Sequence, residues 1–353
     1  MHLRFACASL LGLAALNACA DAPSAPSARP DAPARSLSAG AGAAYTGPQT
    51  DYQPSLLREP DGSLTMVVER LGAGNSGDLL ITRSVNGGAT WTVPSPIIAS
   101  SLNERHPALV RLASGGYALF FMVDEGRGRY RIHRATSPDG NAWTRHGALA
   151  LGWKQPGEIN PAVIVEGDGS LTMTYHLYQG AAYIARSTNG GATWDALRTS
   201  VSGGATAALP RIAKRASDGR YVVTYQVNPG DGNLDIYAKV SASPYDWSAA
   251  PTAVSVGDNS HDAQPIVLPD GRFYLVHAAV MGAQNFNLFA RTSADGIAWS
   301  APAQLTTDAT LADVEPHPIA GATPGTVVLA WGRQAAAGTN DYDIWVDPAV
   351  SVP

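Results

Sequence analysis

Acidic, basic and imidazole side chains recur at two positions along this 353-residue chain. One position lies just before a proline that returns at regular intervals, and the other ends the second apolar run after each proline. The polar residues at these positions are Asp51, Glu69, Arg70, Arg105, His106, Asp124, Glu125, Glu158, Asn160, His176, Tyr178, Gln226, His261, Asp262, His277, Asp313, Glu315 and Arg333. With His317, they include five of the eight histidines, which favours a shared site over a solvated rim of loops.

Two carboxyl groups from this set could cleave a glycosidic bond as a pair. One protonated carboxyl gives its proton to the leaving oxygen, and an ionised partner acts as base or nucleophile. Glu158 is the first candidate, because it stands at the start of a strand-like run in a repeat unit far from the N-terminal segment. Glu315 and Asp124 are candidates for the partner, and Glu69 could also serve by orienting Arg70.

The basic and aromatic members of the set suit the binding of a sugar. Guanidinium groups bind anionic groups in bidentate fashion, and imidazole and phenol groups supply hydrogen bonds and stacking faces. The substrate-binding candidates are Arg70, Arg105, His106, His176, Tyr178, His277 and Arg333.

Each of these residues also has a structural interpretation. Glu69 and Arg70 could form an ion pair between repeat units, and acidic residues at loop ends often cap turns. His176 and His277 lie within strand-like runs, where a buried, hydrogen-bonded histidine is the alternative to a binding residue. A metal site built from His106, His261 and His317 lacks any local ligand spacing, so we expect no metal and no other cofactor.

A short turn recurs along the chain and indicates how these residues are positioned. "SVNGGATW" (84–91) returns as "STNGGATW" (187–194), and related turns end at Trp143, Trp247 and Trp299, about 52 residues apart. The Asn or Asp can bond its own backbone, Gly supplies a positive φ, and Trp packs between sheets. The turns are therefore predicted to be structural. A second series runs beside them, with prolines at Pro54, Pro107, Pro161, Pro210, Pro265 and Pro316.

The runs between these landmarks are short and rich in β-branched and aromatic residues, which is typical of strands. Four strands in each of six units predict an all-β fold, a six-bladed β-propeller of four-stranded antiparallel sheets over residues 45–353. The last unit ends early at "YDIWVDP" (342–348), so we expect the segment around Ala43 to Gln49 to supply its outer strand. The site is expected around the central pit, on the face opposite the Trp turns.

The turns resemble the Asp-boxes, or BNR repeats, of the sialidase (neuraminidase) superfamily. The resemblance covers nearly the whole chain after the N-terminal segment and implies a sialidase-like propeller that acts on glycans. The chain departs from the family's catalytic set, because "Tyr52-Gln53-Pro54" has no Arg where the first carboxylate-binding Arg is expected, whereas "Glu69-Arg70" fits the second.

Two further elements of the family's catalytic set are incomplete. Asp78 is the only carboxylate where the acid/base Asp would lie, and "ADVEPHP" (312–318) lacks the nucleophilic Tyr. The resemblance therefore implies a glycoside hydrolase acting on a glycan other than a standard sialoside. The alternative is a non-catalytic surface lipoprotein that binds carbohydrate or protein.

The N-terminal segment is predicted to direct export. Arg4 precedes an apolar run (5–16) that is too short to span a bilayer as a stable anchor, and the following "LNAC" (16–19) resembles a bacterial lipoprotein box. We expect a signal peptide over residues 1–19, lipidation at Cys19 and an Ala/Pro/Ser-rich tether over 20–44. The alternative is secretion after cleavage near "ACA" (18–20).

Charge and composition limit the classes of molecule that the protein is expected to bind. The net charge of −5 and the lack of a basic stripe argue against nucleic acid. The expected ligand is a glycan or glycoconjugate, and the expected state is a monomer that meets a membrane only through its lipid. The expected location is the outer membrane or cell surface, or the periplasm or medium if Cys19 is not lipidated. After cleavage at most one Cys remains, so stability must come from packing without an intramolecular disulfide.

Overall fold

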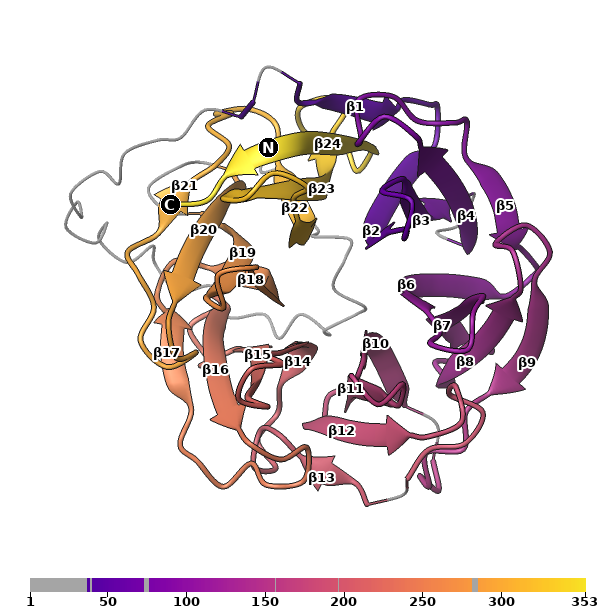
Figure 1. The fold of residues 1–353 in the computed structure, drawn as a ribbon, viewed down its shortest axis with the longest axis vertical. Coiled ribbons are helices and arrows are strands. Elements are labelled where there is room, and N and C mark those ends of the chain that lie inside the picture. The colour runs from indigo at the N-terminus through magenta and orange to yellow at the C-terminus, as the bar shows by residue number, and fades with distance from the viewer. Residues whose placement is uncertain (1–36, 39, 73–75, 156, 196, 281–284) are drawn as a thin grey trace, which may run out of the picture.

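The computed structural model describes residues 37–38, 40–72, 76–155, 157–195, 197–280 and 285–353. This part of the chain forms six four-stranded antiparallel sheets arranged as a ring around a central axis (Figure 1). The fold is therefore the predicted all-β, six-bladed propeller. The predicted signal peptide, Cys19 and most of the predicted tether lie outside the described residues. Within the described residues no helix is long and apolar enough to cross a bilayer.

Each blade places its strands in order from the axis outward (Figure 1). Blades one to three contain β2 (Thr50–Arg58), β3 (Leu64–Leu71), β4 (Gly77–Ser84) and β5 (Ser95–Ile98); β6 (Asn103–Arg111), β7 (Tyr117–Asp124), β8 (Tyr130–Ser137) and β9 (Thr144–Ala148); β10 (Glu158–Val165), β11 (Leu171–Leu177), β12 (Ala182–Ser187) and β13 (Thr199–Ser200). Blades four to six contain β14 (Ala208–Lys214), β15 (Tyr221–Val227), β16 (Asp235–Ser241) and β17 (Thr252–Ser255); β18 (Ser260–Val267), β19 (Phe273–Ala279), β20 (Asn287–Ser293) and β21 (Ala303–Gln304); β22 (Asp313–Ala320), β23 (Thr326–Gln334), β24 (Tyr342–Ser351) and β1 (Gly42–Tyr45).

The Trp turns join the third and fourth strands and are held by their own side chains. Ser84 Oγ accepts the N–H of Gly88 at 2.9 Å, and Asn86 Oδ1 accepts the N–H of Thr90 at 2.9 Å. The indole N–H of Trp91 donates to the carbonyl of Gly88 at 3.0 Å. The turn over 187–194 repeats these three bonds at 2.9, 2.9 and 3.1 Å. These bonds confirm that the turns have the predicted structural role.

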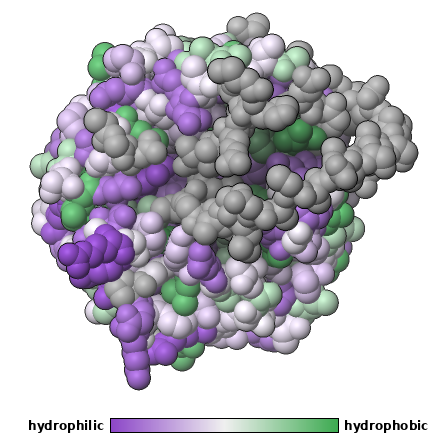
Figure 2. Space-filling model, turned by 180° about the vertical axis from the view of Figure 1, so that it is seen from behind, coloured by the Kyte–Doolittle hydropathy of each residue, from purple (hydrophilic) through white to green (hydrophobic). Residues whose placement is uncertain are grey.

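Apolar layers between neighbouring blades form the core. Phe120 of β7 meets Trp194, which follows β12, edge-on with ring centroids 5.5 Å apart. Met66 of blade one packs in the same cluster as Val346 of blade six. On the face turned away from Figure 1, hydrophilic and hydrophobic residues mix in small groups over the described surface (Figure 2). The hydrophobic driving force is therefore concentrated between the blades.

The ring closes through both ends of the chain. β1 pairs antiparallel with β24 and forms the outer strand of blade six (Figure 1). This confirms the closure predicted around Ala43 to Gln49, although the strand covers Gly42–Tyr45. The backbone N–H and the hydroxyl of Ser38 donate to the carboxylate of Asp347 at 2.7 and 2.5 Å. The chain therefore contacts blade six before β1 begins, within the predicted tether.

Every innermost strand is interrupted by a β-bulge near its start. One residue in each bulge has a left-handed backbone, with φ between 46° and 58° in the six blades: Gln53, His106, Asn160, Leu209, Asp262 and Glu315. In five blades a proline follows, which suits a position where the ladder is broken because proline has no N–H. In blade five Ala263 takes this place. Pro265 therefore lies two residues beyond the place that the other five prolines take at the bulge.

Candidate functional site

A cavity of about 860 Å³ follows the propeller axis. We call the face where the innermost strands begin the upper face, and the face that carries the Trp turns the lower face. Three left-handed residues, Gln53, His106 and Glu315, line the upper end of the cavity. The walls continue along the innermost strands to the hairpin over 166–168 and to Gly219, near the lower face. The sequence analysis expected the site at the upper face, whereas the cavity extends from there toward the lower face.

Glu315 and its neighbours form a buried polar group at the upper end of the cavity. The amide of Gln53 donates to Oε1 of Glu315 at 3.1 Å, and its nitrogen lies 3.5 Å from Nε2 of His106. Burial and the nearby charge of Asp262 raise the pKa of Glu315 well above its ordinary value, although Arg211 acts in the opposite direction. Burial therefore favours the protonated form of Glu315, in which the carboxyl can act as an acid.

The histidine beside Glu315 is neutral. Burial and the charges of Arg105 and Arg211 lower the pKa of His106 well below its ordinary value. A neutral imidazole offers one donor and one acceptor, which suits a hydroxyl-rich ligand.

The carboxylate of Asp262 is held by groups of blades four and five. This carboxylate lies 2.8 Å from Nδ1 of His261, and the backbone N–H of Asp262 donates to Oε1 of Gln226 at 3.2 Å. The ring of Phe286 packs edge-on against His261, with centroids 4.3 Å apart. Asp262 is thus fixed on the blade next to Glu315, behind the residues that line the cavity. Sequence analysis named Asp262 as a polar residue and did not choose it for catalysis.

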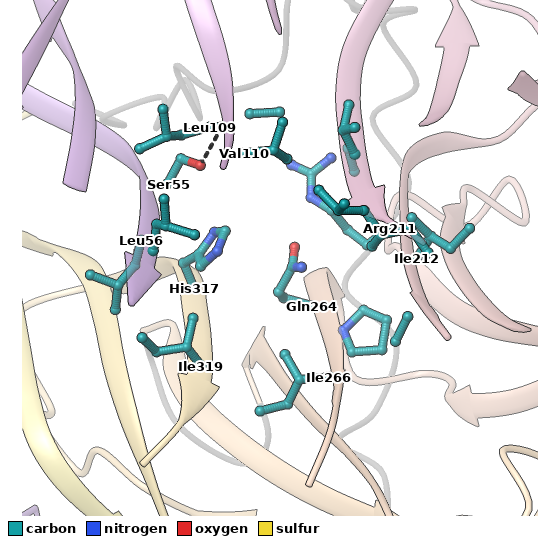
Figure 3. A pocket seen from close by; sticks show the side chains of 18 of the residues that line it. Ser55, Leu56, Leu109, Val110, Arg211, Ile212, Gln264, Ile266, His317 and Ile319 are labelled. Carbon is teal, nitrogen blue, oxygen red and sulfur yellow. Dashed lines mark hydrogen bonds between the residues drawn. The ribbon is translucent and has the colours of Figure 1, made fainter. Parts of the chain in front are cut away.

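Arg211 of β14 lines the cavity below the bulge and projects into it (Figure 3). Its hydrogen bond is to the carbonyl of Pro210 at 3.4 Å, and none of the described carboxylates lies within ion-pair distance of its guanidinium group. Burial lowers the pKa of Arg211, but an arginine remains charged in proteins. Sequence analysis missed Arg211; its signal is a charged residue directly after the proline of an otherwise apolar innermost strand.

The three predicted binding arginines are neutralised by carboxylates. Arg70 makes a bidentate pair with Asp51 at 2.7 and 2.8 Å. Arg105 pairs with Glu69 of the neighbouring blade at 2.7 Å. Arg333 pairs with Asp308 and, at 3.4 Å, with Asp313. None of these arginines lines the cavity, so their placement favours the structural interpretation.

Side chains at one position of the second strand hold the left-handed residue of the next blade. Glu69 Oε2 accepts the N–H of His106 at 2.9 Å, and Nδ1 of His176 accepts the N–H of Leu209 at 3.1 Å. Gln226 makes the third such bond, to Asp262. Burial and the charge of Arg211 lower the pKa of His176 to about 3, so its ring is the neutral acceptor that this bond needs. Glu69 and His176 thus position the upper end of the cavity.

Glu158 and Asp124 lie outside the cavity lining. Glu158 is 1% exposed, and its Oε1 lies 3.8 Å from Nη1 of Arg131. Burial raises the pKa of Glu158. Asp124 accepts the N–H of Gly126 at 2.8 Å and so caps a turn. The raised pKa of Glu158 favours it as the first catalytic candidate, whereas its position outside the cavity lining disfavours it.

Tyr178 and His277 also lie apart from the cavity. The ring of Tyr178 is 5.3 Å from that of Tyr130 between blades two and three. His277 is fully buried beside Phe289, with ring centroids 6.0 Å apart. By strand register, His277 takes the place that aromatic core residues take in four other blades: Phe121, Tyr175, Tyr225 and Trp331. Its placement is that of a core residue.

Among the described residues, no group of three or more His, Cys, Asp or Glu side chains could hold a metal ion. His106 and His317 both line the cavity, and His261 is turned toward Asp262. Burial lowers the pKa of His317 to about 4.

Comparisons with known proteins reveal similarity of fold at low sequence identity. Neither the protein-family models nor the curated protein sequences compared with the chain match it. A protein of unknown function from Dyadobacter fermentans has a TM-score of 0.66 and 14% identity, over 87% of this chain and 96% of that chain. The α-L-arabinanase of Penicillium chrysogenum, solved with arabinobiose, gives 0.60 and 15%, over 85% and 94%. The NanB sialidase of Streptococcus pneumoniae gives 0.68 and 11%, over 88% and 71%.

Proposed function

We propose that this protein acts on glycans as a glycoside hydrolase, with Glu315 as the acid and Asp262 as its carboxylate partner. The observation that carries the proposal is the raised pKa of the buried Glu315, to which the charge of Asp262 contributes. Glycosidic cleavage requires a carboxyl that holds a proton and a second carboxyl group nearby, and burial favours the protonated form of Glu315. The fold adds support, because an arabinanase and a sialidase are built on similar propellers.

The contacts of the two carboxyl groups suggest how they divide the work. Gln53 donates to Oε1 of Glu315, which leaves Oε2 free to carry the proton toward the glycosidic oxygen. As that proton is transferred, the bond between the anomeric carbon and the leaving oxygen breaks. Asp262 either accepts a proton from a water molecule that attacks the anomeric carbon, or attacks that carbon itself to form a glycosyl-enzyme, which a water molecule then hydrolyses. The neutral ring of His106 is a partner for a sugar hydroxyl.

The proposed substrate is a glycoside other than a standard sialoside. Tyr52 stands where the resemblance leads us to expect the first carboxylate-binding Arg, and its ring packs on Tyr342 with centroids 4.5 Å apart. Export and lipidation at Cys19 belong to the same proposal, because a glycan of the cell exterior is reached only by an exported protein.

A hydrolysis screen tests the assignment. The full chain and its Glu315→Gln and Asp262→Asn variants are incubated with arabino-oligosaccharides, sialosides and a panel of aryl glycosides. Glu315→Gln should lower the turnover of any substrate found by about 10²- to 10⁴-fold, as expected for loss of a general acid. Glu158→Gln is the matched control, since Glu158 is buried like Glu315 but lies outside the cavity lining and, unlike Asp262, contributes no charge to the raised pKa of Glu315; it should retain most of the activity. Full activity in Glu315→Gln would contradict the proposal.

The second candidate is a binding protein without catalysis. Its support is that Arg70, Arg105 and Arg333 are each paired with carboxylates, which is typical of arginines that stabilise a scaffold. Binding of a glycan without turnover by the wild-type chain would favour this candidate.

A further inference from the structure

The cavity below the bulges is divided into a polar half and a half of small residues. The residue two positions after the left-handed residue is polar in blades four to six and small in blades one to three: Arg211, Gln264 and His317, against Ser55, Ala108 and Ala162. Figure 3 shows the three polar side chains turned toward one another across the cavity. The small residues leave space in front of the guanidinium group.

The walls two residues further down are aliphatic in all six blades. They consist of Leu57, Val110, Ile164, Ala213, Ile266 and Ile319. At about 3.3 Å per residue, the path from the level of Arg211 to that of Lys214 is about 10 Å long. Such a lining suits an alkyl or aryl body, whereas a sugar ring would leave its hydroxyl groups without partners there.

Arg211 differs from the cations at the lower end of the cavity. Lys214 pairs with Glu166, and Arg111 pairs with Glu59 at 2.9 Å. Arg211 has no ion-pair partner among the described residues, and the charges of Glu315 and Asp262 act on it from beyond ion-pair distance. A guanidinium group in these surroundings is stabilised by an anion with bidentate geometry.

We propose that the cavity binds an amphiphilic monocarboxylate, with its carboxylate on Arg211 and its apolar body along the aliphatic walls toward the lower face. Gln264 and His317 supply further hydrogen bonds to the head group. This site goes beyond the proposed hydrolase, because it requires neither Glu315 nor Asp262 to perform chemistry.

Isothermal titration of the full chain with octanoate tests the proposal. Octanoate should bind at one site, and affinity should rise by up to about fourfold for each methylene between butyrate and octanoate, since each buried methylene contributes a constant increment. Octan-1-ol, which lacks the charge, should bind at least about tenfold more weakly, as expected for loss of a charge-assisted pair.

Two variants locate the site. Arg211→Gln should weaken octanoate binding at least about tenfold and remove the preference over octan-1-ol. Ala162→Leu keeps the charge and fills the space beside Arg211, because β10 is next to β14, so it should also weaken binding. It preserves the test if Arg211→Gln fails to fold. Arg129→Gln is the matched control, because this arginine is 62% exposed and lies outside the cavity lining.

The outcomes are distinct from those of the hydrolysis screen. Octanoate affinity that is lost in Arg211→Gln or Ala162→Leu and kept in Arg129→Gln supports the site, whether or not a glycoside is cleaved. The absence of octanoate binding, or equal affinity in wild type, Arg211→Gln and Ala162→Leu, would overturn it.

Discussion

At the residue scale, buried histidines tie the stability of the propeller to pH. Burial and the charge of Arg291 lower the pKa of His277 to about 3, while the unfolded chain has an ordinary value near 6.5. Between these values the unfolded chain binds a proton that the folded chain does not, so the free energy of unfolding falls as pH falls. The slope is about 1.4 kcal/mol per pH unit for one histidine.

Replacing His277 with Phe should remove this share of the acid sensitivity. Phe is chosen because four other blades carry an aromatic residue at this position. We expect a change at pH 7.5 of less than about 1.5 kcal/mol, as for a core substitution of similar shape. Between pH 4 and pH 6 the stability curve should be shallower by about 1.4 kcal/mol per pH unit. Urea unfolding at several pH values measures both quantities. His146→Gln, at an exposed position, should alter the slope much less; an unchanged slope in His277→Phe would refute the assignment.

The orientation of single residues explains why Arg211 could not be found from the sequence. Polar residues before a repeating proline pointed to Glu315 and His106 as candidates, and both line the cavity. Sequence reasoning did not find Arg211, whose direction depends on the bulge in β14. A bulge changes which side chains of a strand face the axis, and a pattern of alternating residues does not reveal it.

At the element scale, the second strand of one blade fixes the bulge of the next. Glu69 joins β3 to β6 through both Arg105 and the backbone of His106. Its side chain is fully buried, and that of Arg105 is 7% exposed. A pair of this kind costs much when one partner is removed, because the other charge is left buried.

Glu69→Ala should therefore lower the free energy of unfolding by about 3–5 kcal/mol. Glu125→Ala is a suitable comparison, since Glu125 is 24% exposed and pairs with Arg129, which is 62% exposed, and with His133 at 3.1 Å; that change should cost clearly less than Glu69→Ala. Chemical denaturation of both variants measures the difference. Equal losses of unfolding free energy in the two variants would show that the pair of Glu69 with Arg105 contributes no more to stability than a surface pair.

The strands and turns themselves were largely predictable from the sequence. The Trp turns appear as written in the sequence, because their bonds are local and made by residues within four positions of one another. Blade five departs from the pattern, since Ala263 occupies the position of the bulge proline and Pro265 lies beyond it. A near-constant interval could not distinguish these two positions.

At the scale of the whole molecule, the ring depends on a strand from the opposite end of the chain. A variant beginning at Pro48 lacks β1 and the bonds of Ser38 to Asp347, and it exposes the edge of β24. Hydrogen bonds to a charged group contribute about 1.5–3 kcal/mol each, so stability should fall by at least about 2 kcal/mol.

The control for this truncation begins at Leu37 and keeps β1. It should unfold at the same urea concentration as the full chain, whereas the shorter variant should unfold earlier and associate at high concentration through its free edge. Size-exclusion chromatography with light scattering measures the association. A monomeric short variant of full stability would show that β1 is dispensable.

The position of β1 also has a consequence for biosynthesis. Ser38 and Asp347 are 309 residues apart, so the ribosome releases one partner near the start of translation and the other near its end. Blades one to five can assemble while the chain grows, but blade six must wait until the last strands emerge. During that interval the nascent propeller is an open arc, and a chaperone or a second nascent chain has its best opportunity to engage the unpaired strands.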